Sequence, residues 1–144
     1  MKKLLASRSS IWISFLLLGS PQLQAGELTI TIKDIVEQEG GIMIAVLSSE
    51  QQFNEKAPPV ASMILHPSGD TTSFTLHDVT PGSYGIRVMH DINGNAKMET
   101  NLVGMPKEPW GFSNNATGKF GPPKWKAVKF EVEAHTEAVI NLNR

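Results

Sequence analysis

No cysteine occurs in this chain of 144 residues. Its absence excludes disulfide bonds and thiolate chemistry, and it also argues against a lipid anchor. The fold must therefore be held together by packing, with at most the help of a metal ion. Residues 26–144 are numerous enough to form one domain with a core of its own.

Long hydrophobic runs and basic stretches are missing too. The longest apolar run, residues 11–19, is far shorter than the roughly 20 residues that a membrane-spanning helix needs. No basic stripe is present, so nucleic acid is not an expected partner, and no strong charge pattern indicates a membrane surface. The patterns Gly-x-Ser-x-Gly and His-Glu-x-x-His, which mark two hydrolase classes, are absent as well.

The first 25 residues have the layout of a secretory signal. A short basic stretch with Lys2, Lys3 and Arg8 precedes the apolar run, and the small residue Ala25 ends the segment. Because such segments are removed on export, we expect residues 1–25 to be a signal peptide and the mature protein to be periplasmic or secreted. The mature chain then has 10 basic and 14 acidic residues, a net charge of −4.

Alternation of apolar and polar residues dominates the rest of the chain. Seven segments show it or are apolar throughout: 27–35, 42–49, 60–66, 71–79, 80–91, 126–133 and 136–142. Short strands separated by turn residues are typical of a β-sandwich. We therefore predict an all-β, seven-stranded Greek-key sandwich of transthyretin- or immunoglobulin-like type, as a single domain over residues 26–144. Segment 42–49 is apolar on both faces, which predicts a central strand covered on both sides.

One interval does not fit this scheme of short strands and turns. Residues 91–123, between the fifth and sixth predicted strands, show little alternation and many Gly, Asn and Pro residues. A structureless loop of that length is uncommon in a domain and is usually functional or disordered. Disordered segments are poor in large apolar residues, whereas this one contains Leu102, Val103, Met105, Trp110, Phe112 and Phe120. We predict an ordered loop that packs on itself.

The region from the fifth predicted strand onward carries four unusual segments in order. They are His-Asp-Ile-Asn-Gly-Asn (90–95), Pro-Lys-Glu (106–108), Gly-Phe-Ser-Asn-Asn (111–115) and Phe-Gly-Pro-Pro (120–123). In these segments the chain resembles the bacterial domain-of-unknown-function family 2141, whose members join an export signal to one β-domain. The resemblance extends over nearly the whole mature chain. It implies fold and export but no chemistry, because the family has no assigned activity.

A second, remote resemblance concerns residues 76–88. Their sequence, LHDVTPGSYGIRV, is similar to the strand–Pro-Gly–strand element of transthyretin-like and carboxypeptidase-regulatory-like domains. That similarity implies a sandwich and carries no function, since one fold serves many activities.

The start of the loop has the spacing of a calcium site. An EF-hand-type loop takes oxygen ligands from positions one, three, five, seven and nine, which here are Asp91, Asn93, Asn95, the Lys97 carbonyl and Glu99. The pattern is incomplete, because Leu102 stands at position twelve and Ala96 stands where the sharp turn needs glycine. The family likewise often has Gly and Asp where this chain has Ala96 and Glu99. The alternative is that these Asp and Asn residues only form turns.

His90 continues the inward face of the fifth predicted strand. A histidine in that position is expected to be buried and hydrogen-bonded, and it would donate to a carbonyl of the long loop. Next to Asp91 it would also suit a general base, although no nucleophile stands beside the pair in the sequence.

Both tryptophans of the mature chain lie in the loop or just after it. Trp110, Phe112 and Trp125, with Asn114 between them, have the composition of a surface that binds a sugar or peptide by stacking and a few hydrogen bonds. The alternative is that they form a small core of the loop itself.

These observations favour a non-catalytic, exported β-sandwich that acts as a binding module. The 91–123 loop would form the surface for an unknown protein, peptide or glycan, and calcium is the one candidate cofactor. We expect a monomer with no membrane span in the mature chain. Two alternatives stay open at this point: a purely structural envelope protein, and a hydrolase-like enzyme that uses His90 and Asp91.

Overall fold

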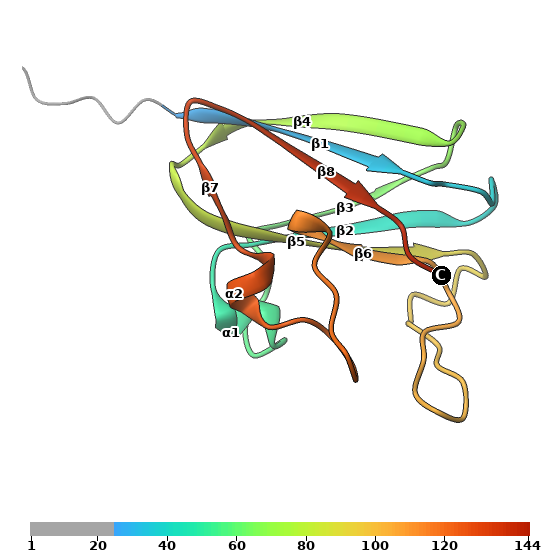
Figure 1. Ribbon diagram of the computed structural model, residues 1–144. Coiled ribbons are helices and arrows are strands. Elements are labelled where there is room, and N and C mark those ends of the chain that lie inside the picture. The colour runs from blue at the N-terminus through green and yellow to red at the C-terminus, as the bar shows by residue number, and fades with distance from the viewer. Residues whose placement is uncertain (1–24) are drawn as a thin grey trace, which may run out of the picture.

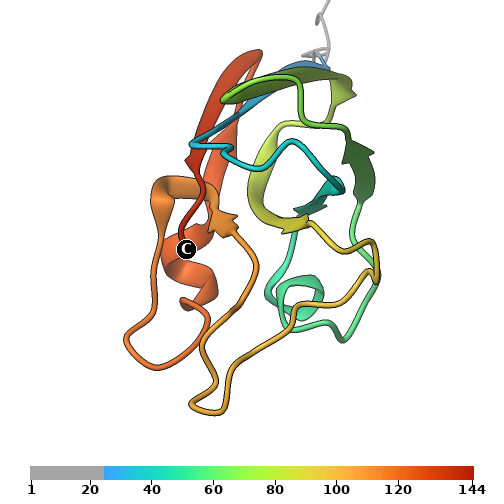
Figure 2. The same ribbon diagram turned by 90° about the vertical axis from the view of Figure 1, so that its right-hand side faces the viewer.

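Residues 25–144, which the computed structural model describes, form two β-sheets that face each other, as Figure 1 and Figure 2 show. The smaller sheet has three strands in the order β4-β1-β8. Its central strand β1 (Gly26–Lys33) pairs antiparallel with β4 (Thr71–Val79) and parallel with β8 (His135–Asn141). The predicted signal segment lies outside the described residues except for Ala25.

The larger sheet has the order β3-β2-β5-β6, and β7 also pairs with β5. Its strands are β2 (Gly41–Leu47), β3 (Ala61–Leu65), β5 (Gly82–Asp91), β6 (Trp110–Phe112) and β7 (Phe130–Val132). Every pair in this sheet is antiparallel. Among residues 25–144, strand β3 pairs with β2 alone, so its other edge has no partner strand in this part of the chain.

Three short helical turns complete the secondary structure: α1 (Glu50–Phe53), η1 (Ser113–Asn115) and α2 (Trp125–Val128). In Figure 1, α1, α2 and the long loops lie beneath the larger sheet, on the side away from the smaller one. Among the described residues, no helix has the length and apolar character needed to cross a membrane.

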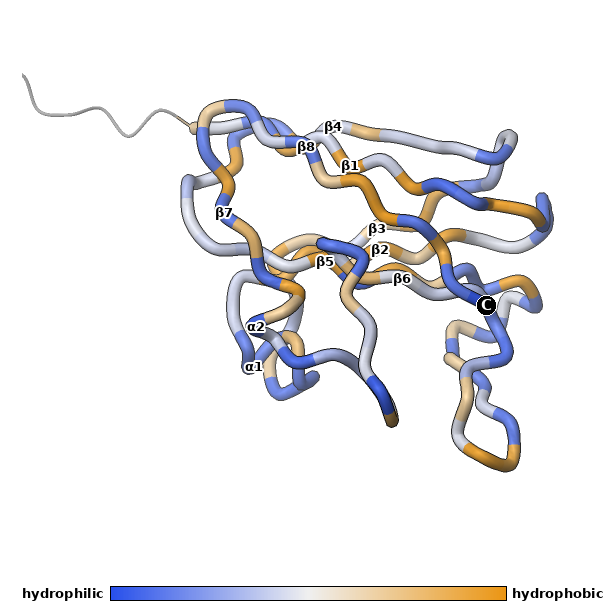
Figure 3. The backbone as a smooth tube through the Cα atoms, viewed as in Figure 1, coloured by the Kyte–Doolittle hydropathy of each residue, from blue (hydrophilic) through white to orange (hydrophobic). Residues whose placement is uncertain are grey.

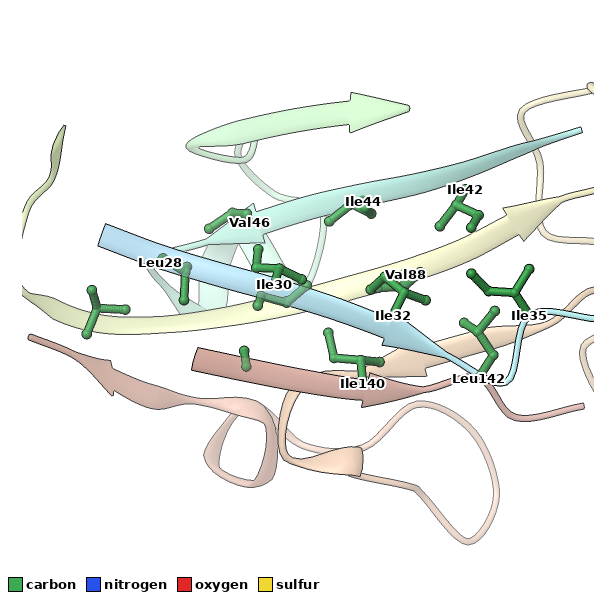
Figure 4. Close-up of a cluster of buried hydrophobic side chains, with 13 residues drawn as sticks. Leu28, Ile30, Ile32, Ile35, Ile42, Ile44, Val46, Val88, Ile140 and Leu142 are labelled. Atoms are coloured by element: carbon green, nitrogen blue, oxygen red, sulfur yellow. The ribbon is translucent and has the colours of Figure 1, made fainter. Parts of the chain in front are cut away.

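The main core lies between the sheets and follows from the alternation in the sequence. In Figure 4 the labelled side chains point toward one another from both sheets. Leu28, Ile30 and Ile32 of β1 are fully buried there, and the inward residues of β2, β5 and β8 meet them. Full burial of one such side chain stabilises the fold by about 1.5–3 kcal/mol, which explains how packing alone holds a chain without disulfides.

A second, smaller cluster lies on the outer face of the larger sheet. Its buried members are Leu47, Phe53, Phe112, Ala116 and Val128, with Ala45, Trp110 and Trp125 half-buried against them. Strand β2 therefore contributes Ile42, Ile44 and Val46 to one cluster and Leu47 to the other. Its apolar residues face both ways because both faces of the strand are covered.

The structure confirms the all-β sandwich and differs from the sequence prediction in three details. An eighth strand, β6, lies inside the segment predicted to be a loop, and α2 replaces the first part of the strand predicted over 126–133. The loop also packs on itself less than expected, because Leu102, Val103 and Phe120 are exposed. The Greek-key description of the connections stays a prediction.

Candidate binding site

The carboxylate of Asp91 organises the turn that follows β5. Its Oδ1 accepts hydrogen bonds from the backbone N–H groups of Gly94 (2.9 Å) and Asn95 (3.1 Å), and its Oδ2 accepts from that of Ala96 (2.8 Å). Ala96 has φ +58°, a left-handed conformation that glycine adopts more readily. This turn needs that conformation at position 96, and the three hydrogen bonds to Asp91 hold it there.

The other predicted calcium ligands lie close by and bond mainly to one another. Asn93 Oδ1 accepts from the N–H of Asn95, Asn95 Oδ1 accepts from that of Lys97, and Asn95 Nδ2 donates to Glu99 Oε1 over 3.2 Å. Within residues 25–144, no group of three or more His, Asp or Glu side chains gathers closely enough to hold a metal ion. The predicted ligand oxygens already accept hydrogen bonds from the protein itself. Calcium binding at this turn stays a prediction that experiment can test.

His90 is fully buried, as the sequence predicts, but its partner is a different one. The ring Nε2 lies 2.9 Å from the carbonyl of Glu39, in the turn before β2, and does not bond to the long loop. The backbone supplies the link to that loop, since the His90 N–H donates to the Pro109 carbonyl over 2.8 Å. Glu108, also buried, accepts from the N–H of Ile92 through Oε1 (3.0 Å).

The Gly-Phe-Ser-Asn-Asn segment joins β6 to the rest of the fold. Asn114, predicted to contact a ligand, donates through Nδ2 to the carbonyls of Ala127, Val128 and Lys129 at 3.0–3.1 Å. Asn115 Oδ1 accepts from the N–H of Asn141 in β8 over 2.8 Å. Both amide groups are hydrogen-bonded to the backbone, so the segment has a structural role in this fold.

The predicted contact aromatics are mostly part of the second cluster. Phe112 is buried, and its ring centroid lies 5.8 Å from that of Phe53. Trp125 lies 6.0 Å from Phe53 by the same measure. Trp110 is half-buried beside Phe112, at 5.7 Å between ring centroids. Of the predicted aromatics, Trp110 and Phe112 line a cavity, whereas Trp125 does not.

That cavity is a groove of about 970 Å³ on the outer face of the larger sheet, which we call the methionine groove. All five methionines that the structure describes line it: Met43, Met63, Met89, Met98 and Met105. The sixth, Met1, lies outside the described residues. Trp110, Arg87 and Lys119 are among the other lining residues. The groove thus combines soft apolar side chains with a tryptophan and two cationic groups.

Strand register explains how methionines far apart in the sequence meet. Met43 of β2 pairs with Met89 of β5, and Met89 pairs with Trp110 of β6, so the three form one row across the sheet. Met98 and Met105 belong to the loop after β5, which lies beneath this face of the sheet in Figure 1. The groove therefore depends on the sheet and on the 91–123 segment together.

Sequence reasoning missed the methionines because they are dispersed along the chain. One signal was available: Met43 and Met89 occupy the outward positions of strands whose inward positions are already apolar. A strand that is apolar on both faces needs a second cover or a ligand. Met63 differs from the others in that it also packs against the main core.

Comparison with known proteins adds one match. No curated protein and no solved structure matches this chain. One family model, described as "Uncharacterized protein conserved in bacteria (DUF2141)", matches residues 30–140. That span contains the larger sheet, the second cluster and the methionine groove. The chain therefore belongs to this uncharacterized bacterial family, as the segments around His90, Glu108 and Ser113 predict.

Proposed function

We propose that this protein is an exported, non-catalytic binding module whose methionine groove takes an extended polypeptide segment with apolar side chains. The observation that carries the proposal is the gathering of Met43, Met89, Met98, Met105 and Trp110 in one groove. It lies beside the edge of β3 that has no partner strand among residues 25–144. Export rests on the signal-like sequence of residues 1–25 alone.

The chemistry of the groove supports an apolar ligand. Methionine is flexible and polarizable, so a surface rich in it adapts to side chains of different shape. A cavity of about 970 Å³ falls within the range typical of ligand sites, about 300–1,000 Å³. Arg87, one of its cationic groups, already bonds to Glu55 over 2.8 Å. Few free polar groups remain to orient a glycan, which disfavours the sugar ligand that the aromatics suggested.

The edge strand supports a polypeptide. Ser62, Met63 and Ile64 of β3 line the groove, and the outer edge of β3 has no partner strand among residues 25–144. An extended peptide that pairs with such an edge gains backbone hydrogen bonds, while its alternate side chains enter pockets on the sheet. A free edge is otherwise prone to aggregation, so a partner strand would also protect it.

The surroundings of His90 and Asp91 support the non-catalytic part of the proposal. His90 is fully buried with Nε2 at the Glu39 carbonyl, and the Asp91 carboxylate accepts three backbone hydrogen bonds. A general base must reach the proton that it removes from the substrate. Neither side chain is arranged for that contact in this structure.

Selection from a phage-displayed random peptide library, followed by fluorescence anisotropy with synthetic peptides, tests the proposal. We expect selected peptides to alternate apolar and polar residues. Met43→Gln and Met89→Gln should each weaken their binding about tenfold, because each replaces buried apolar surface with an amide. Val139→Gln is the matched control, since Val139 is an exposed apolar residue on the smaller sheet, and it should leave the affinity unchanged.

The edge-strand part has its own test. A peptide N-methylated at alternate residues loses the N–H donors on one of its two edges. Methylation on the edge that faces β3 should abolish binding, and methylation of the other alternate set of residues should not. If no peptide binds, or if binding ignores both methionine variants, the groove is not a peptide site. A hit from a glycan array that is lost in Trp110→Ala would favour a sugar instead.

A further inference from the structure

The ends of two loops that border the methionine groove form a second surface, which carries exposed apolar residues that do not line the groove. Leu102 and Phe120 are fully exposed and Val103 is 81 % exposed. In Figure 1 and Figure 2 both loops project from the larger sheet, away from the smaller one. In Figure 3 the ends of both loops are coloured as hydrophobic. We call these ends, residues 101–105 and 118–122, the two loop tips.

The first tip is a hydrogen-bonded hairpin. Thr100 and Pro106 form a β-bridge, and the N–H of Asn101 donates to the Met105 carbonyl over 2.8 Å. Asn101 Oδ1 accepts from the N–H groups of Val103 and Met105, each at 3.0 Å. The turn therefore satisfies its own polar groups and presents Leu102 and Val103 outward. Apolar residues on a hydrogen-bonded turn are accessible to a partner without any unfolding of the loop.

The second tip is equally tight. A Cβ placed on Gly118 would lie 2.1 Å from the carbonyl oxygen of Gly121, and Gly121 itself has φ +137°. Both conditions require glycine. Between them the turn places Lys119 and the fully exposed ring of Phe120 at the surface.

Charge is strongly segregated along the chain. Residues 92–129 contain six lysines and two glutamates, a net charge of +4, and one of those glutamates, Glu108, is buried. The other described residues contain four basic and twelve acidic residues, a net charge of −8. All six lysines are exposed: Lys97, Lys107, Lys119, Lys124, Lys126 and Lys129. The segment that carries the two tips is therefore positive, although the mature protein is acidic.

We propose that the two loop tips dock this protein on the surface of an anionic phospholipid bilayer. Leu102, Val103 and Phe120 enter the boundary between headgroups and acyl chains, and lysines of the same segment lie over the lipid phosphates. Side chains that combine apolar penetration with cationic attraction are the means by which peripheral proteins bind such surfaces. A protein partner fits less well, because lysine is depleted in protein–protein interfaces.

The absence of cysteine makes a direct test available. We would place single cysteines at Val103, at Phe120 and, as a matched control, at the exposed Ser73 on the smaller sheet, and label each with an environment-sensitive fluorophore. With vesicles of phosphatidylcholine and phosphatidylglycerol, the labels at 103 and 120 should brighten and shift to the blue, and the label at 73 should not. Pure phosphatidylcholine should give a much smaller response.

Cosedimentation of the full chain with the same vesicles measures the affinity. Leu102→Ser and Phe120→Ser together should lower the partition coefficient at least tenfold. Lys97→Gln and Lys107→Gln should each lower it about fivefold, an effect that added salt should reduce. All four residues are exposed, so circular dichroism should show unchanged folding. Every variant retains the same N-terminal segment, so a difference between variants reports the tips.

Three outcomes would overturn the proposal. Equal responses from the labels at 73 and 103 would place the contact with lipid elsewhere. Binding that is the same on neutral and anionic vesicles would remove the role of the lysines. Tip labels that ignore vesicles but respond to rising protein concentration would identify a second copy of this chain as the partner.

Discussion

Ser113 donates a hydrogen bond to the carbonyl of Val128 over 2.6 Å, and both residues are fully buried. The same hydroxyl accepts from the backbone N–H of Ile86 over 2.9 Å. One side chain thus joins η1, α2 and β5 beneath the larger sheet. The second cluster and one wall of the methionine groove depend on this connection.

Ser113→Ala should therefore be strongly destabilising for so small a change. It leaves the buried N–H of Ile86 without a partner, at a cost of about 1–3 kcal/mol, and it removes one of the two side-chain hydrogen bonds to the Val128 carbonyl, which Asn114 still reaches. We expect the free energy of unfolding to fall by about 2 kcal/mol or more, measured by urea denaturation. Ser73→Ala is the matched control, because Ser73 is exposed, and it should change the value by less than about 0.5 kcal/mol. Similar losses in both variants would contradict the role of Ser113.

Gly85 should tolerate no side chain. A Cβ there would lie 2.6 Å from Cζ3 of Trp125 and 3.0 Å from Cγ1 of Val128. The indole is held against Phe53, so it cannot move aside freely. We expect Gly85→Ala to lower the free energy of unfolding by about 2 kcal/mol, within the range for overpacked cores. The change should also shift the emission of Trp125.

Gly41→Ala is an instructive comparison for this prediction. Its Cβ would also be close to a neighbour, at 2.7 Å from Cγ2 of Ile64, but Ile64 is exposed, so it can change its χ1 rotamer without displacing core residues. The loss should stay below about 1 kcal/mol. If the two alanine variants lose the same stability, the rigidity of the Trp125 site is not the cause.

Asp91→Asn should weaken the turn after β5. The substitution keeps one acceptor oxygen and replaces the other with an NH₂ group. It therefore removes either the two hydrogen bonds donated by the N–H groups of Gly94 and Asn95 or the one donated by the N–H of Ala96. We expect a loss of about 1–2 kcal/mol in unfolding free energy. Asn93→Ala removes only an exposed bond to the N–H of Asn95 and should cost less than about 0.5 kcal/mol.

Thermal melts in calcium and in chelator decide the metal hypothesis. Since the turn is closed by its own hydrogen bonds, we expect equal melting temperatures and an equal Asp91→Asn effect in both buffers. Calcium binding to the native state alone would instead add about 2.7 kcal/mol at a hundredfold excess over Kd. A calcium-dependent rise that Asp91→Asn abolishes would support the calcium site that the sequence predicts.

Stability in acid should depend on the pair formed by Glu37 and Arg144, whose two contacts measure 3.0 and 2.8 Å. Burial raises the pKa of Glu37, but a backbone hydrogen bond and the Arg144 guanidinium together lower it below its ordinary value of 4.5. A lowered pKa in the folded state stabilises the protein above the unfolded pKa, and this contribution is lost as pH falls through the folded value.

Arg144→Met should thus lower the unfolding free energy at neutral pH by at most about 1 kcal/mol, as is usual for exposed pairs. The difference from the wild type should shrink below about pH 4.5 and vanish in stronger acid. Lys33→Met removes an exposed charge that has no ion pair among residues 25–144. Its effect should show no such step at acidic pH.

The strands of the sandwich were predictable because burial of one face leaves a period of two in the sequence. Leu28, Ile30 and Ile32 show that period, and they are the centre of the core. The alternation of Val128, Phe130 and Val132 led to the prediction of a single strand over all three residues. Val128 instead ends α2 and enters the second cluster, while the other two lie in β7. Alternation over three apolar residues does not distinguish a strand from a helix end followed by a strand.

The candidate sites were less predictable, because they depend on pairings between distant segments. Met43 and Met89 are neighbours only through the register of β2 and β5. The lysine-rich segment is hidden by a net charge summed over the whole chain, which led to the prediction that no charge pattern indicates a membrane. The exposure of Phe120 depends on how the loop turns, which composition does not reveal.

The parallel pairing of β1 with β8 constrains the order in which this protein folds. Glu27 pairs with His135 and Lys33 pairs with Asn141. One whole edge of the central strand can therefore pair only once the last residues of the chain are present. Contacts between such distant positions close late and slow folding. The core around Ile30 is therefore completed only after the residues of β8, near the end of the chain, have been synthesised.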